Sequence, residues 1–369
     1  MGDASTGSVV EMEVSMSKSK VRMIVILVVT LFVVSACAFT LDRYALSSLY
    51  SRVPDQKISL LPHYELFEKD YPRTDVEFQL DDYTLRGHVY GADNTRGLII
   101  FRHGIFSKHA DYLPLITAMV DKGWRIFAYD AIGCGESDGD STLGMSQSPL
   151  DVAAAVEFVH DSGLADGMPL ALWGHSWGGY GVAAALAKAS DVDACVTMSG
   201  YDTPMKILDY SSTSSFGPLG KIQYPFLWLN TVIDFGDNAN LSASDAIMNS
   251  GVPTLVIHGA GDGTVAYEGV SILDALQKSS QDLSEMNIQL TTLSEPGRDG
   301  HNSYFYSPES QAYLDECATA LQGMLDENDD DADAPEVQSY LASVDLKRAN
   351  IADPALIDEI DSFLASAVK

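Results

Sequence analysis

The chain has 369 residues, with 52 acidic and 22 basic side chains and a net charge of −30. Phosphate binding needs clustered Lys and Arg, so this balance excludes nucleic acid as a partner and disfavours docking of the folded part on an anionic lipid surface. The length fits one large domain or two ordinary ones. The four cysteines lack the spacing of metal ligands and form no disulfide framework.

Residues 1–20 are small and polar and are expected to form a disordered cytoplasmic N-terminus. No charged residue occurs from Met23 to Leu41, which is about the length of a helix that crosses a bilayer. We therefore predict a transmembrane signal anchor over residues 21–41. The basic residues just before it keep the N-terminus in the cytoplasm and place the rest of the chain outside the cell membrane.

Two alternatives for this segment remain open. A basic start and a short apolar core also fit a cleaved signal peptide, which would leave a secreted protein. The run Val34–Cys37 resembles the bacterial lipobox, in which the cysteine becomes the lipidated N-terminus. The apolar run continues past Cys37 to Leu41, and this favours the signal anchor over a lipoprotein.

After a connector over residues 42–72, apolar runs alternate with helical patterns. The predicted strands are 75–80, 83–90, 97–102, 124–129, 169–173, 194–198, 253–257 and 288–293. The predicted helices are 112–122, 148–160, 178–189, 265–277 and 308–325. Strands that alternate with helices after an initial hairpin indicate an α/β fold, with a mostly parallel eight-stranded sheet and helices on both faces. We assign this domain to residues 73–325.

Two segments depart from the alternation. Residues 201–250 form an aromatic-rich insertion, which we expect to act as a short cap that covers the site and supplies an apolar pocket. Residues 326–369 begin with an acidic linker, followed by apolar residues at helical spacing. We expect two short amphipathic helices that dock back on the domain.

The run Trp173–Gly179 holds Ser176 in the pattern Gly-x-Ser-x-Gly, between an apolar stretch and a helical pattern. This is typical of a nucleophile elbow, where the chain turns sharply from strand to helix. Side chains two residues before or after the serine would collide across the turn. The helix N-terminus also favours developing negative charge, so Ser176 is the expected nucleophile.

A serine hydroxyl needs a base, and the base needs a third group to hold it. Asp262 lies in a glycine-rich loop after the predicted strand 253–257, and His301 lies in a loop after the last strand. The order Ser176, Asp262, His301 is the one expected for a strand-end triad. Asp202 and Asp299 are rival acids, and the loop of Asp262 favours it over both.

An oxyanion hole needs two backbone N–H donors. Trp177, next to the nucleophile, should supply one. Ile105, after Gly104 in the loop that follows the third strand, is the first choice for the other, and Phe106 is the second. The remaining histidines near these strand ends are interpreted as structural, and Cys134 has no base placed beside it. The structural histidines are His103, His109, His175 and His258.

These motifs together resemble the α/β-hydrolase superfamily over residues 73–325, and most closely its monoacylglycerol lipase, lysophospholipase and serine-aminopeptidase-like branch. The matching stretches are Phe101–Gly104, Tyr129–Ser137, Gly174–Gly179, His258–Val265 and Gly300–His301. The resemblance implies a serine hydrolase. Monoacylglycerol lipases usually have a glutamate and a second histidine after the oxyanion glycines, whereas residues 105–109 here read Ile-Phe-Ser-Lys-His. This departure counts against a glyceride substrate.

The expected activity is hydrolysis of a carboxylic ester, from a small molecule or a lipid of the lysolipid or monoacylglycerol type, through an acyl-enzyme on Ser176. This chemistry needs no metal or organic cofactor. A peptidase or amidase with the same triad is the first alternative. A membrane-tethered binding protein that lost catalysis is the second, and an intact triad speaks against it. Dehalogenases and epoxide hydrolases are disfavoured because they use Asp where Ser176 stands.

Overall fold

A computed structural model describes residues 17–54 and 59–368. At its centre lies one eight-stranded sheet in the order β1-β2-β4-β3-β5-β6-β7-β8. The strands are β1 Arg73–Leu80, β2 Tyr83–Tyr90, β3 Leu98–Arg102, β4 Arg125–Tyr129, β5 Leu170–His175, β6 Ala194–Met198, β7 Thr254–Gly259 and β8 Ile288–Leu293. β2 pairs antiparallel with β1 and β4, and the other pairs are parallel. The predicted eight-stranded, mostly parallel sheet is confirmed.

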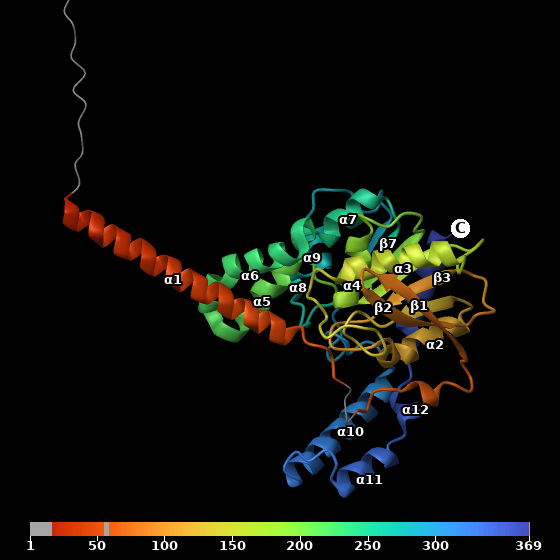
Figure 1. Ribbon diagram of the computed structural model, residues 1–369. Coiled ribbons are helices and arrows are strands. Elements are labelled where there is room, and N and C mark those ends of the chain that lie inside the picture. The colour runs from red at the N-terminus through yellow and green to blue at the C-terminus, as the bar shows by residue number, and fades with distance from the viewer. Residues whose placement is uncertain (1–16, 55–58, 369) are drawn as a thin grey trace, which may run out of the picture.

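The sheet is buried on both faces, which is why its inner strands appear as continuous apolar runs. In β5, Leu170 and Leu172 join the core cluster on one face, whereas Ala171 and Trp173 join the cluster on the other. Figure 1 shows helices on both sides of the sheet. The first face is covered by α3 Ser148–Ser162, α4 Trp177–Ala185, α7 Ala243–Ser250 and α9 Ile272–Gln277. The second is covered by α2 Leu113–Asp121 and α13 Pro354–Ala367.

Two predicted helices have different ends in the structure. The helix expected over 265–277 is broken into α8 Tyr267–Val270 and α9, because Gly269 adopts a φ of +77° and Ser271 caps the second helix. The helix expected to run to residue 189 ends at Ala185. Two short 3-10 helices, η1 Tyr64–Leu66 and η2 His109–Tyr112, lie earlier in the chain.

The predicted insertion forms a helical hairpin that stands away from the sheet (Figure 1). It comprises α5 Pro204–Phe216, η3 Gly217–Leu219, α6 Gly220–Phe235 and η4 Gly236–Asn240. We call residues 204–240 the cap. The rest of the predicted insertion, helix α7, returns to the core through Ala243, Ala246 and Ile247.

Helix α1, Lys18–Leu49, contains the predicted membrane segment but is longer at both ends. Residues 1–16, most of the predicted disordered segment, lie outside the described residues. The helix continues past residue 41 to Leu49, and in this last part Arg43 pairs with Asp234 of α6 at 2.6 Å. α1 is long and apolar enough to cross a membrane, and its apolar window is not buried against the protein.

Beyond the predicted domain end at residue 325 the structure has three helices, α11 Pro335–Ser343, α12 Leu346–Ala349 and α13, where two were expected. α11 packs against the preceding helix, α10 Pro308–Glu327, and α12 follows. α13 then returns to the sheet, where Ile357 and Ile360 are buried in the core. The last layer of the fold is therefore built from residues beyond 325.

Residues 307–351 form an excursion that closes on itself. Tyr306 and Ala352 form an antiparallel bridge at its base. The amide of Ser307 donates to the carbonyl of Ile351, and the amide of Asp353 donates to that of Phe305, at 2.9 and 2.8 Å. The chain thus leaves the core and re-enters it at the same point.

Candidate active site

Ser176 lies in the sharp turn between β5 and α4. Its backbone adopts φ 57° and ψ −116°, a conformation that a non-glycine residue keeps only under constraint. The flanking glycines make the turn possible: a Cβ on Gly174 would lie 2.3 Å from the carbonyl oxygen of Gly178. The hydroxyl is held at the carboxyl end of the central strands, beside the N-terminus of α4.

His301 and Asp262 meet Ser176 from the loops after β8 and β7. His301 Nε2 lies 2.9 Å from Ser176 Oγ, and His301 Nδ1 lies 2.7 Å from Asp262 Oδ2. The other oxygen of Asp262 accepts bonds from the amides of Thr264 and Val265, each at 2.9 Å. The structure thus brings the three predicted residues together in one hydrogen-bonded chain.

The environment of Asp262 favours its charged form. Burial alone would raise the pKa of this carboxyl. The hydrogen bond and charge of His301, with the amide of Val265, outweigh burial and lower the pKa below its ordinary value. A carboxylate that stays ionised beside the Nδ1 side of an imidazole orients the ring and stabilises its cationic form.

The rival acids lie elsewhere. Asp202 pairs with Lys206 at 2.7 Å and accepts a bond from the amide of Ser244 at 3.0 Å. Asp299 Oδ2 would meet a Cβ on Gly261 at 2.6 Å, so its carboxylate faces that glycine. Within the described residues, the carboxylate that contacts the His301 ring is that of Asp262.

The loop after β3 carries the predicted oxyanion donors. The carbonyl of Gly104 accepts bonds from His103 Nδ1 at 2.7 Å and from Ser107 Oγ at 2.8 Å, which fixes the turn. Phe106 has a φ of +60° and is half-exposed. Among residues 17–54 and 59–368, the amides of Ile105 and Trp177 donate no hydrogen bond to protein acceptors. Both are free to donate to a bound oxygen atom.

Comparison with known proteins shows what the chain is similar to in sequence and in fold. A family model for serine aminopeptidases (S33) matches residues 93–206. The protein YfhR of Salmonella typhi, itself uncharacterised, is 24% identical over 279 residues, which cover 71% of this chain and 86% of that protein. The Pyrococcus furiosus esterase Pf2001 superposes with a TM-score of 0.50 at 18% identity, over 75% of this chain and 98% of that one. The chain has the α/β-hydrolase fold.

A third protein matches a shorter part of this chain. The polyketide transferase grgF of a Penicillium species is 31% identical over 132 residues, which cover 35% of this chain and 45% of that protein. The family model and the relatives support a hydrolase, and the similarity to the esterase structure supports the fold.

A relay of polar groups joins the loop after β3 to the loop that carries His301. The amide of Gly104 donates to the hydroxyl of Tyr112 at 3.1 Å, and that hydroxyl lies 2.8 Å from His175 Nδ1. His175 Nε2 in turn lies 3.1 Å from the carbonyl of His301. Tyr112 was missed from the sequence because it lies inside a helix pattern. The sequence did indicate a supporting role for His175, because this residue directly precedes the nucleophile Ser176.

His103 and His258 are buried as well. Burial is the largest cause that lowers the pKa of His103 to about 3 and that of His258 below its ordinary value, so both stay neutral. His103 Nε2 accepts a bond from the amide of Ala131 at 2.9 Å, and His258 Nε2 lies 2.9 Å from the carbonyl of Val265. Their contacts are those of supports for the two loops.

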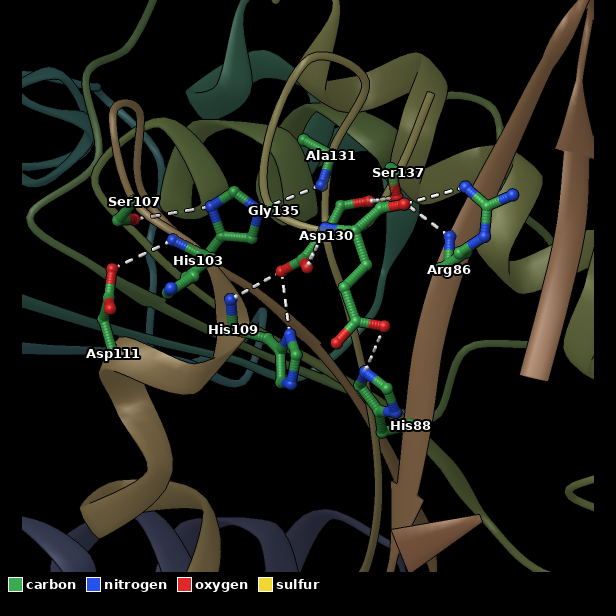
Figure 2. A network of polar contacts seen from close by, with 12 residues as sticks. Arg86, His88, His103, Ser107, His109, Asp111, Asp130, Ala131, Gly135 and Ser137 are labelled. Atoms are coloured by element: carbon green, nitrogen blue, oxygen red, sulfur yellow. Dashed lines mark hydrogen bonds and ion pairs between the residues drawn. The ribbon is translucent and has the colours of Figure 1, made fainter. Parts of the chain in front are cut away.

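Asp130, at the end of β4, organises a second polar network behind the oxyanion loop (Figure 2). Its Oδ1 accepts from both the amide and Nδ1 of His109, each at 2.8 Å, and its Oδ2 accepts from the amide of Glu136 at 2.9 Å. Burial opposes ionisation, but the charge and hydrogen bond of His109 hold the pKa of Asp130 well below its usual range. This network fixes the loop that carries Cys134, a thiol whose pKa burial raises to about 12.

A cavity of about 350 Å³ opens beside the oxyanion loop. Phe106 and Ser107 line one side, and Leu341 and Leu346, from the excursion over residues 307–351, line another. The loop that carries the predicted oxyanion donor therefore borders a space of ligand size.

Proposed function

We propose that this protein is a serine hydrolase that cleaves carboxylic esters through an acyl-enzyme on Ser176. The observation that carries the proposal is the 2.9 Å contact between Ser176 Oγ and His301 Nε2, with Asp262 on the other ring nitrogen. A nucleophile within reach of a base that a carboxylate orients is the arrangement that acyl transfer requires.

In the first half of the reaction, His301 Nε2 takes the proton of Ser176 as Oγ attacks the ester carbonyl carbon. The amides of Ile105 and Trp177 hold the negative oxygen of the tetrahedral intermediate. The intermediate collapses, the bond to the alkoxy oxygen breaks, and His301 gives its proton to the leaving alcohol.

In the second half, water attacks the acyl carbon. His301 takes a proton from that water and returns it to Ser176 Oγ as the acyl–serine bond breaks. The products are a carboxylic acid and the free enzyme. Asp262 keeps Nδ1 protonated throughout, so Nε2 always faces the serine in the form that each step needs.

Replacement of Ser176 by Ala tests the proposal. The variant should keep the wild-type circular dichroism spectrum, lose hydrolysis of a p-nitrophenyl ester, and lose labelling by a fluorophosphonate probe. Undiminished turnover by the folded variant would refute it. Failure of the wild-type protein to react with the probe would favour a membrane-tethered, non-catalytic binding protein.

A peptidase or amidase is the second candidate, because the matching family model describes serine aminopeptidases. The same triad serves both reactions, and they differ in the leaving group that His301 protonates. A panel of short-chain esters, lysolipids, monoacylglycerols and aminoacyl amides separates them by kcat/KM. The lysolipid and monoacylglycerol esters belong in the panel because the cap is rich in apolar side chains.

The proposal includes a membrane anchor. Helix α1 would span the cell membrane over residues 21–41, with the hydrolase domain on the extracytoplasmic side, as supported by the unburied apolar window of α1 and the basic residues before it. Resistance of the membrane-bound protein to carbonate extraction tests the span. Release by signal cleavage would indicate secretion, and loss of anchoring in Cys37→Ala would indicate a lipoprotein.

A further inference from the structure

Nearly all of the large apolar side chains that the described residues leave exposed lie in two places. Apart from Phe106 and Ile351, every large apolar side chain that the described residues leave exposed lies on α1 or on the cap. The exposed members on the cap are Phe216, Leu219, Ile222, Tyr224, Trp228, Leu229 and Ile233. We call this set the cap patch. Its concentration on one helical hairpin marks an interaction surface.

The cap patch is continuous with the apolar helix α1. Asn230 Nδ2 lies 3.5 Å from the carbonyl of Phe39, and Asp234 pairs with Arg43. Both contacts join residues that are 191 positions apart, so a later residue of α1 contacts a correspondingly later residue of α6. The two helices therefore run side by side in the same direction. The start of α6 therefore points toward the apolar N-terminal half of α1, as Figure 1 shows. From Asn230 back to its first residue, Gly220, the helix rises about 15 Å.

The charge of this region differs from that of the rest of the chain. Residues 210–233 hold no acid, although the chain carries 52, and their one charged side chain is Lys221. A long lysine side chain can reach the lipid headgroups while its stem stays in apolar surroundings. Trp228 donates its indole N–H to Asn240 and leaves its ring half-exposed, which suits the membrane–water interface.

We propose that the cap patch is seated in the outer leaflet of the same bilayer that α1 spans. This inference rests on the anchor described under the proposed function and adds a second point of attachment. Two attachments fix the orientation of the domain. The inner side of the cap packs Leu208 and Leu227 near Met145, whose carbonyl accepts the indole N–H of Trp177 beside the nucleophile. The cap is thereby linked to the nucleophile turn through Met145 and Trp177.

A native fluorophore reports on the seating. Of the four tryptophans, Trp124, Trp173 and Trp177 are fully buried, so Trp228 is the one that lipid can reach. The full chain is reconstituted in phosphatidylcholine vesicles that carry bromine on the upper part of the acyl chains. We expect loss of Trp228 emission relative to unbrominated vesicles, and no such loss in Trp228→Phe. Equal emission in both kinds of vesicle would overturn the proposal.

A native thiol reports separately on α1. Cys37 is exposed on α1, whereas Cys134, Cys195 and Cys317 are buried. In intact vesicles Cys37 should resist a membrane-impermeant maleimide. A reactive Cys37 would mean that the anchor itself fails. A protected Cys37 with unquenched Trp228 would mean that α1 spans the bilayer and the cap patch does not enter it.

A matched pair of substitutions completes the test. Ile222→Glu places a charge in the cap patch at a side chain 64% exposed, and Ile351→Glu places one at a side chain 52% exposed outside it. Ile222→Glu should reduce quenching of Trp228 with unchanged turnover of a soluble ester, and Ile351→Glu should change neither. Quenching unaffected by Ile222→Glu would overturn the proposal. The proposal would also be overturned if Trp228 became less accessible to solvent as the protein concentration in detergent rises. That result would indicate that the cap patch binds a second copy of the chain.

Discussion

The backbone of Gly178 lies against the backbone of Arg102: a Cβ on Gly178 would stand 2.0 Å from the carbonyl oxygen of Arg102. This contact joins the first turn of the nucleophile helix to the end of the strand that carries the oxyanion loop. Ser176 and the predicted donor Ile105 are therefore held relative to each other through main-chain atoms, which cannot move aside as a side chain could.

Gly178→Ala is expected to destabilise the protein by about 3 kcal/mol or more, because the added methyl group meets rigid backbone. Urea denaturation followed by circular dichroism measures the change. Gly323→Ala is the matched control, since that helical glycine has nothing within 4 Å of its Cβ position. It should gain about 0.5–1 kcal/mol of stability from helix propensity. Similar stabilities for the two variants would contradict the steric interpretation.

Asp262→Asn should lower kcat for a p-nitrophenyl ester by about 10³–10⁴-fold, because an amide no longer holds the Nδ1 proton or stabilises the imidazolium. Stability should fall far less than activity. Asp299→Asn is the control, since its carboxylate lies near the same loop and faces Gly261. That variant should keep near wild-type kcat. A large loss of kcat in Asp299→Asn with little loss of kcat in Asp262→Asn would identify Asp299 as the acid that orients His301.

Ile360→Ala should destabilise the fold by about 2–5 kcal/mol, because this α13 side chain is fully buried against the sheet. Ile351→Ala, at an exposed position, should change stability by no more than about 0.5 kcal/mol. Thermal denaturation of both variants measures the contrast. Equal melting temperatures would show that α13 contributes little to the stability of the core.

Stability should depend on pH through His103, whose pKa of about 3 lies below the ordinary value near 6.5 of an unfolded chain. Between these pH values His103 is protonated in the unfolded chain and neutral in the native state, so the free energy of unfolding falls as pH falls. The loss is about 1.4 kcal/mol per pH unit, or about 2 kcal/mol at pH 5, and vanishes above pH 6.5. His103→Gln should show a shallower slope in denaturant titrations from pH 7 to 5. An identical slope would assign the proton uptake elsewhere.

The sheet was predictable from the sequence because its strands are buried on both faces and are bounded by turn residues. The elbow was predictable because Gly174 and Gly178 are required by sterics. The helix break at Gly269 was missed because a helical apolar pattern continues across it, and only the φ of +77° reveals the turn. The length of α1 was also missed, because the uncharged run ends before Asp42 and Arg43, and the sequence does not show that Arg43 has a partner on α6.

The site was predictable at the level of its three polar side chains, which follow strand ends in a recognised order. Its supports were less so. Tyr112 is one residue of an apolar helix start, and only folding brings its hydroxyl between Gly104 and His175. The place of α13 was also hidden, because amphipathic spacing indicates that a helix packs on something without naming the surface.

The closed base of the excursion over residues 307–351 has an evolutionary consequence. Because Ser307 and Ile351 are bonded to each other, this arm can lengthen, shorten or be exchanged while its attachment points stay where they are. The residues before it carry the imidazole of His301, and those after it complete the core through α13. Changes in the length or residues of this arm can therefore alter the cavity that Leu341 and Leu346 line while the two attached core segments keep their places.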